Sequence, residues 1–305
     1  MFRNLSTTGK LSLALVIIVL SGIAVFLLSL LLAIPLYGVN LIATPDALNN
    51  PENIEVAKFF QITNSIGIFI LPAILIAYLF EARAFGFLAM DKKPYWSNLL
   101  IIILSMYLLL PTIERVSVWN AGMVLPDALA GLEQWMRATE EAAAKLTTEF
   151  LRMDSLGVLG VNLLMIALIP ALGEELLFRG VIQQYLVKWF RNKHVAVWVT
   201  AFFFSALHMQ FFGFLPRFLL GVYLGYIFLW SQNLWYPILG HFVNNASAVV
   251  FYYFYQDQLA EKIADPEMLP QSPWLLLSSL FVLSFMTLIF VKKQWGHGEV
   301  RGQDI

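Results

Sequence analysis

The chain has 305 residues, of which 59% are hydrophobic and 13% are charged, about half of the roughly 25% charged share of an average soluble domain. Its formal net charge of −1 provides no basic field that would attract nucleic acid, so we expect no nucleic-acid partner. The absence of cysteine excludes disulfides, a cysteine nucleophile and thiolate metal sites. The composition predicts an all-α, polytopic membrane protein.

Eight apolar segments approach or exceed the length of about 20 residues that a transmembrane helix needs. The first is longer than the apolar region of a signal peptide and has no small-residue cleavage site after it, so we interpret it as a retained span. The eight predicted spans cover residues 11–37, 59–80, 97–113, 157–178, 195–212, 216–231, 235–255 and 273–291.

These spans suggest four regions along the chain. They are three N-terminal transmembrane helices in 1–113, an extracytoplasmic amphipathic helix region in 114–156, a core of helices in 157–255, and the last transmembrane helix with a cytoplasmic tail in 256–305.

The region 114–156 carries apolar residues at helical spacing, together with Glu141 and Lys145 in the favourable i,i+4 order. We expect an amphipathic helix that lies on the outer membrane surface. A packed loop helix and a lid that guides substrate are the two alternatives. The apolar stripe consists of Leu129, Leu132, Met136, Ala143, Leu146 and Phe150.

Basic residues gather in alternate short loops, which indicates the orientation of the chain in the membrane. If the eight spans alternate, these residues all fall on one side, and the opposite short loops are mainly acidic. We therefore expect a multi-pass protein of the cell (plasma) membrane with both termini in the cytoplasm. The basic residues are Arg3, Lys10, Arg83, Lys92, Lys93, Lys188, Arg191, Lys193, Lys292, Lys293 and Arg301.

Three ionisable residues, Glu174, Glu175 and Arg179, lie within six consecutive positions at the end of the fourth span. An unpaired charge in a membrane span costs several kcal/mol. Glu175 and Arg179 are four residues apart on one helical face, so we expect them to neutralise each other. Glu174 is rotated by about 100° from Glu175 and lacks that partner. We therefore expect Glu174 to face an internal cavity.

Three further polar residues fall within later spans, namely His208, His241 and Asn245. The rise of about 1.5 Å per residue places both histidines at depths compatible with one cavity that also contains Glu174. A glutamate beside a histidine can hold and deprotonate a water molecule. A second histidine and an amide can donate hydrogen bonds to a developing oxyanion, which completes the parts for amide hydrolysis.

The same glutamate and two histidines, Glu174, His208 and His241, also match a zinc site with an open water position. The residues alone leave the zinc-dependent and the metal-independent mechanism open.

Three motifs occur in order on separate spans and resemble the CPBP family, which comprises the type II, glutamate-dependent CAAX prenyl endoproteases and the bacterial Abi-type relatives. The EExxxR motif runs from Glu174 to Arg179, FxxxH from Phe204 to His208, and HxxxN from His241 to Asn245. The resemblance covers about 157–255. It implies an intramembrane endopeptidase of about eight helices with a cavity open to the cytosol.

The resemblance also implies a role for each motif residue. Glu174 and His208 would activate the water, and His241 and Asn245 would form the oxyanion hole. The supporting residues would be Glu175, Arg179 and Phe204. The substrate would be a membrane-associated protein or peptide, and a CAAX-like or lipidated one is the class that the resemblance suggests.

Two other functions use the same residue types. Glutamate and histidine relays also occur in proton-coupled carriers, although carriers typically have broken helices in symmetric halves. A non-catalytic membrane scaffold or immunity protein could retain the fold. A scaffold, however, has no physical need for an unpaired buried glutamate such as Glu174.

Overall fold

The computed structural model describes residues 2–39 and 53–262. Within these ranges all regular structure is helical, which confirms an all-α membrane protein. Among the described residues, five helices are long and apolar enough to cross a membrane: Thr7–Tyr37, Ile54–Phe80, Trp96–Ala121, Leu156–Phe190 and Phe214–Ser231. The predicted span 273–291 lies outside the described residues, so the count of eight stays a prediction.

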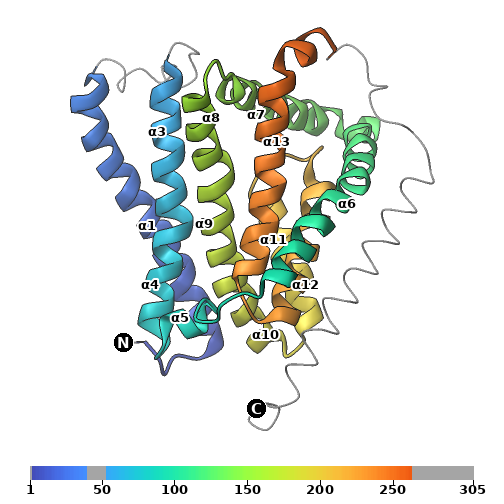
Figure 1. Cartoon of the computed structure of the whole chain (residues 1–305). Coiled ribbons are helices and arrows are strands. Elements are labelled where there is room, and N and C mark those ends of the chain that lie inside the picture. Colours follow the sequence, from blue (N-terminus) through green and yellow to red (C-terminus); the bar gives the residue numbers. More distant parts are fainter. Residues whose placement is uncertain (1, 40–52, 263–305) are drawn as a thin grey trace.

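The helices run up and down in a bundle, with α7 across one end (Figure 1). The N-terminal part contains α1 (Thr7–Tyr37), α3 (Ile54–Ser65), η3 (Ile66–Ile70), α4 (Leu71–Phe80), α5 (Ala84–Phe87), α6 (Trp96–Ala121), η4 (Asp127–Leu129) and α7 (Ala130–Leu151). The rest contains α8 (Leu156–Asn162), η5 (Leu163–Leu168), α9 (Ile169–Leu177), η6 (Phe178–Gln183), α10 (Gln184–Phe190), α11 (Lys193–Ala206), α12 (Phe214–Ser231) and α13 (Trp235–Lys262).

Two of the helix ends that differ from the predicted spans affect the connection of His208. The third span was expected over 97–113, but α6 continues through Pro111 to Ala121. The fifth was expected over 195–212, but α11 ends at Ala206 and contains only 14 residues. The chain turns there because Met209 adopts a left-handed φ of 53°. His208 therefore lies in the connection 207–213, and not inside a helix.

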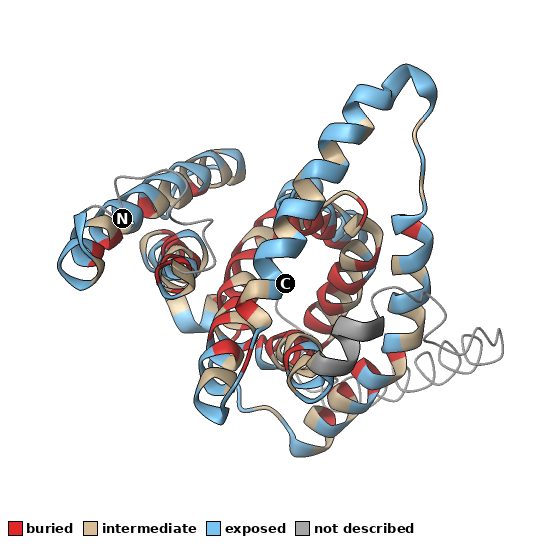
Figure 2. Cartoon of the chain, turned by 90° about the horizontal axis from the view of Figure 1, so that it is seen from above, coloured by how far each residue is buried: buried red, intermediate tan, exposed pale blue. Residues whose placement is uncertain are grey.

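The surface of the bundle is apolar and its interior holds polar side chains, as expected for a protein in lipid. Figure 2 shows buried residues on the inward faces of the helices, while α1 at the edge of the bundle is mostly exposed. Lys10 ties α1 to the rest by donating to the carboxylate of Glu81 at 2.9 Å and to the carbonyl of Phe80.

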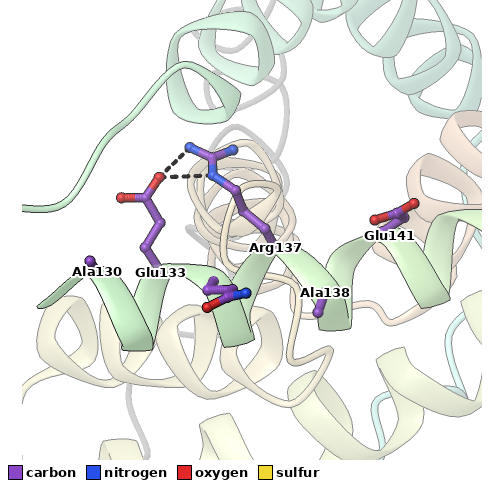
Figure 3. Close-up of a pocket in the computed structure, with 6 residues that line it drawn as sticks. Ala130, Glu133, Arg137, Ala138 and Glu141 are labelled. Carbon is purple, nitrogen blue, oxygen red and sulfur yellow. Dashed lines mark hydrogen bonds and ion pairs between the residues drawn. The ribbon is translucent and has the colours of Figure 1, made fainter.

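The helix expected in the region 114–156 is present as α7, at the end of the bundle opposite the N-terminus (Figure 1). Its i,i+4 ion pair joins Glu133 and Arg137, about two helical turns before the predicted Glu141–Lys145 pair. Figure 3 shows this pair beside a depression of about 480 Å³ whose lining also includes Glu141. All of the lining residues belong to α7, so the depression is separate from the motif residues.

The N-terminus, α5 and α10 lie together at the other end of the bundle (Figure 1). The predicted basic loops of the described chain therefore share one face of the molecule.

Candidate active site

The motif glutamates lie on α9, between two π-helical segments, η5 and η6. A π-helix is rare and is commonly found at functional sites. Pro170 in the first turn of α9 has no N–H, so the carbonyl of Ile166 lacks its regular i+4 donor. The carbonyl of Ile166, eight residues before Glu174, is therefore open to a donor from another helix.

Glu175 and Arg179 form the expected ion pair. The guanidinium Nη1 lies 2.6 Å from the carboxylate Oε1, and both side chains are completely buried. Nη2 donates to the carbonyl of Gly221 on α12 at 2.9 Å, and the guanidinium carbon lies 4.8 Å from the centre of the Phe204 ring. The pair is therefore fixed by α11 and α12 as well as by its own helix.

His241 on α13 bridges the two glutamates. Its Nδ1 lies 2.9 Å from Oε1 of Glu175, and its Nε2 lies 3.9 Å from Oε2 of Glu174. A carboxylate that also binds Arg179 can only accept, so Nδ1 carries a proton and donates it. In a neutral ring, Nε2 would then offer a lone pair toward Glu174, and a protonated ring would donate from both nitrogens.

This contact differs from the roles that the sequence predicts for the two carboxylates. The sequence predicts that Glu175 pairs with Arg179 and that Glu174 faces the cavity of the histidines. In the structure, the carboxylate that is hydrogen-bonded to His241 is Glu175, and Glu174 is the more distant partner. Oε1 of Glu175 accepts from both Arg179 and His241, because a carboxylate oxygen has two lone pairs.

Glu174 is the carboxylate without a committed partner. Its side chain is 12% exposed, and its Oε2 is buried without a hydrogen bond among the described residues. Two carboxylates here face one guanidinium, so a protonated His241 would balance the charge of the cluster. A buried oxygen without a hydrogen bond lowers the stability of the fold, and it remains able to accept a proton.

His208 approaches the cluster through Phe204. The ring Nδ1 lies 2.9 Å from the carbonyl of Phe204. Because a carbonyl only accepts, Nδ1 carries the proton, and a neutral ring offers a lone pair at Nε2. The Phe204 ring packs edge-on against both histidine rings, with centroid distances of 5.4 Å to His208 and 5.8 Å to His241. Within the described chain no hydrogen bond joins His208 to Glu174.

Asn245 lies one turn after His241 on α13 and makes different contacts. Its Nδ2 donates to the orphan carbonyl of Ile166 at 3.1 Å, and its Oδ1 accepts from Asn244 at 3.1 Å. One of its two N–H bonds is thus used to fasten α13 to η5, and the other can donate elsewhere. No direct contact between Asn245 and the glutamates is present in the described part.

We tested the zinc hypothesis against the arrangement of side chains. Zinc needs three protein ligands about 2.0–2.2 Å from one point. Among the described residues, no group of three histidine and carboxylate side chains is arranged to hold a metal ion. His241 and Glu174 are close to each other, but His208 does not join them. In this arrangement the described side chains do not supply the three ligands of a zinc site.

Sequence reasoning missed two contacts that hold the site together. Arg179 and Gln183 donate to the carbonyls of Gly221 and Gly225, at 2.9 and 3.0 Å. A Cβ at Gly225 would lie 2.9 Å from Val197, so this glycine allows α11 and α12 to approach closely. The G-x-x-x-G spacing is a known signal for close helix packing in membranes, and it could have revealed this contact.

Comparisons with known proteins agree with the motif resemblance. Residues 157–247 match the family model of type II CAAX prenyl endopeptidase Rce1-like proteins. This segment is less than a third of the chain. The uncharacterized protein YpbD of Bacillus subtilis (strain 168) is 29% identical over 89 residues. The alignment covers 28% of this chain and 42% of that protein. No solved structure matches the chain.

The family match covers the segment with all three motifs, and it supports a CAAX-type intramembrane endopeptidase in general. The remaining two thirds of the chain lie outside it.

Proposed function

We propose that the chain is an intramembrane endopeptidase that cleaves a peptide bond in a membrane-associated protein or peptide. The observation that carries this proposal is the buried, unpaired oxygen of Glu174, 3.9 Å from His241. The neighbouring Glu175 is committed to Arg179 and His241. One carboxylate is thus free to act as a base while the other is fixed.

In the proposed mechanism Glu174 and His208 activate a water molecule. Glu174 accepts a proton as the water oxygen forms a bond to the scissile carbonyl carbon. A tetrahedral oxyanion results, and the proton is then delivered to the leaving amine as the C–N bond breaks. His208 offers its Nε2 as a second acceptor for the same water.

His241 and the second N–H of Asn245 would stabilise the oxyanion. For His241 this role requires the doubly protonated ring, because Nδ1 already donates to Glu175. We thus propose that Glu175 and Arg179 act on the reaction through His241, and that Phe204 packs between the two histidines.

The likeness to CAAX endopeptidases suggests lipidated or CAAX-like proteins as substrates. Such proteins carry their lipid at the cytoplasmic membrane surface. The basic loops that share the N-terminal end of the bundle support a cytoplasmic location for that end. We propose a multi-pass protein of the plasma membrane whose N-terminus faces the cytoplasm.

Terminal-peptide mass spectrometry on membranes from cells with the wild type or with Glu174→Gln tests the proposal. The substitution keeps the shape of the side chain and removes its basicity. We expect new peptide ends that require Glu174. Glu133→Gln on α7, expressed at the same level, is the control and should retain these ends. A cellular phenotype that depends on the protein and persists in Glu174→Gln would instead favour a non-catalytic scaffold.

Zinc dependence is tested on the purified protein. Our mechanism predicts that cleavage survives a chelator and that added zinc has no effect. Loss of cleavage on chelation with recovery on zinc addition would show that the active form uses zinc, for which Glu174, His208 and His241 are the candidate ligands.

A further inference from the structure

A second amide lies on the face of α13 that carries His241 and Asn245. Asn244 follows His241 by three residues and precedes Asn245 by one, and positions i, i+3 and i+4 share one side of an α-helix. Its side chain is partly buried, and its Nδ2 donates to Oδ1 of Asn245 at 3.1 Å. Asn244 therefore contacts a residue of the proposed oxyanion hole, although none of the three motifs includes it.

Two partners fix the orientation of the Asn245 amide. The carbonyl of Ile166 can only accept, so the nitrogen of the amide faces it, at 3.1 Å. The oxygen of the amide points the other way and meets the donor of Asn244. A single hydrogen bond would let the amide swing about its Cβ–Cγ bond, because this terminal torsion is broad. With a partner at each end, the amide plane is held, and so is the direction of its second N–H bond.

On the basis of the proposed function, we propose that Asn244 is a positioning residue for the oxyanion hole. It acts through Asn245, whose second N–H it keeps aimed at the developing oxyanion. A donor stabilises a transition state best when it is oriented before the charge develops. Loss of Asn244 therefore slows the chemical step and leaves substrate binding unchanged.

Asn244→Leu tests this role, because leucine keeps a branched side chain and has no hydrogen-bond donor. Purified full-length protein in lipid nanodiscs receives a peptide that spans one of the Glu174-dependent cleavage positions found in membranes. Complete loss of an oxyanion donor lowers kcat by about 10²–10³, so a donor that is kept but held less well should cost about 10-fold. We expect this fall in kcat with an unchanged KM.

The control for this measurement is Ser247→Ala. Ser247 lies on the same helix, and its hydroxyl donates to the hydroxyl of Tyr107 on α6 at 3.5 Å. The substitution also removes one side-chain hydrogen bond of α13, but one that does not involve Asn245. Its kcat should equal that of the wild type.

Two further variants separate positioning from packing. Asn244→Gln keeps an amide donor and should retain part of the kcat that Asn244→Leu loses. In the Asn245→Ala background, Asn244→Leu should change kcat little, because the group that it orients is gone. A packing role predicts instead that Asn244→Leu lowers kcat by the same factor in both backgrounds.

The hydrogen bond between the two amides is measured without a substrate. Asn244→Leu should lower the thermal unfolding midpoint more in the wild-type background than in the Asn245→Ala background, since only the wild type has this bond to lose. Equal shifts in the two backgrounds would show that Asn244 does not hold Asn245.

Three results of the cleavage assay would overturn the proposal. They are a wild-type kcat in Asn244→Leu, a loss that appears in KM and not in kcat, and a loss of the same factor in the Asn245→Ala background. If Glu174-dependent ends occur and Asn244→Leu cleaves normally, only the positioning role fails. If no such ends occur in membranes, the endopeptidase proposal fails, and the role of Asn244 in the reaction fails with it.

Discussion

Two glutamate–arginine pairs with the same four-residue spacing occur in different surroundings. Glu175 and Arg179 are completely buried between helices, whereas Glu133 and Arg137 lie on α7 with 15% and 47% of their side chains exposed. Each pair also fixes a third group: Glu175 holds His241, and Glu133 accepts from the backbone N–H of Leu125. The four-residue spacing sets the geometry of each pair. The burial of the pair determines how much stability is lost when the pair is broken.

The largest expected effect comes from breaking the buried pair. Arg179→Met would leave the Glu175 charge buried with only a histidine beside it, which typically costs about 3–5 kcal/mol. We expect a strongly lowered thermal unfolding midpoint, measured by intrinsic fluorescence in detergent. Arg137→Met on α7 is the matched control and should change the midpoint little, since exposed pairs contribute little. Equal shifts in the two variants would contradict the comparison.

Removing both charges of the buried pair separates stability from activity. In the double variant Glu175→Leu/Arg179→Met neither member of the pair leaves a charge behind, so we expect most of the stability lost in Arg179→Met to return. Activity should stay at least about 100-fold below the wild type, because His241 has lost the carboxylate that orients it. Turnover and unfolding midpoint are measured on the same preparation. Recovery of activity together with stability would show that Glu175 has only a structural role.

A smaller effect is expected where α6 holds the connection of His208. The side chain of Asn120 donates to the carbonyl of Phe211 at 3.3 Å and accepts from the N–H of Leu215 at 2.8 Å. Asn120→Ala leaves both groups unpaired and should cost about 1–3 kcal/mol. Hydrogen exchange of the peptide 207–215 should become faster, while Gln134→Ala on exposed α7 should leave it unchanged. Unaltered exchange in Asn120→Ala would refute this role.

The smallest effect is the pH response of α7. Hydrogen bonds from the N–H of Leu125 and from Arg137 lower the pKa of Glu133 below its ordinary value of 4.5. A lowered folded-state pKa means that the stabilisation is present above 4.5 and is lost as the pH falls through the lowered value. Hydrogen exchange of residues 123–137 should therefore accelerate only in that acidic range, and Glu133→Gln should abolish the acid response. An acceleration between pH 5 and 7 would contradict it.

The sequence predicted those parts of the molecule that depend on local spacing. Helices were expected because apolar runs of the right length have few other solutions in lipid. The Glu175–Arg179 pair followed from i,i+4 geometry, and both residues lie on one continuous helical segment. The amphipathic helix of the region 114–156 was predicted for the same reason.

Contacts between distant segments were not predictable in this way. The spacing of Glu174 and Glu175 does not reveal that His241, 66 residues later, contacts the second of them. The early end of α11 was missed because 207–212 contains no glycine or proline to mark a break, and the turn depends on a left-handed residue that is not glycine. The π-helical segments around α9 likewise leave no periodic signature in so short a run.

The hydrogen bond from Asn245 to Ile166 has a consequence for how variants combine. Pro170 cannot donate to the carbonyl of Ile166 that accepts from Asn245, so we expect the two positions to be energetically coupled although they lie on different helices. A residue with an N–H at position 170 would supply the regular donor, and removal of the Asn245 amide would then cost less. A double-mutant cycle of Pro170→Ala with Asn245→Ala should thus show a non-additive stability. If Asn245→Ala still lowers turnover in the Pro170→Ala background, the remaining loss measures how much Asn245 contributes to stabilising the oxyanion.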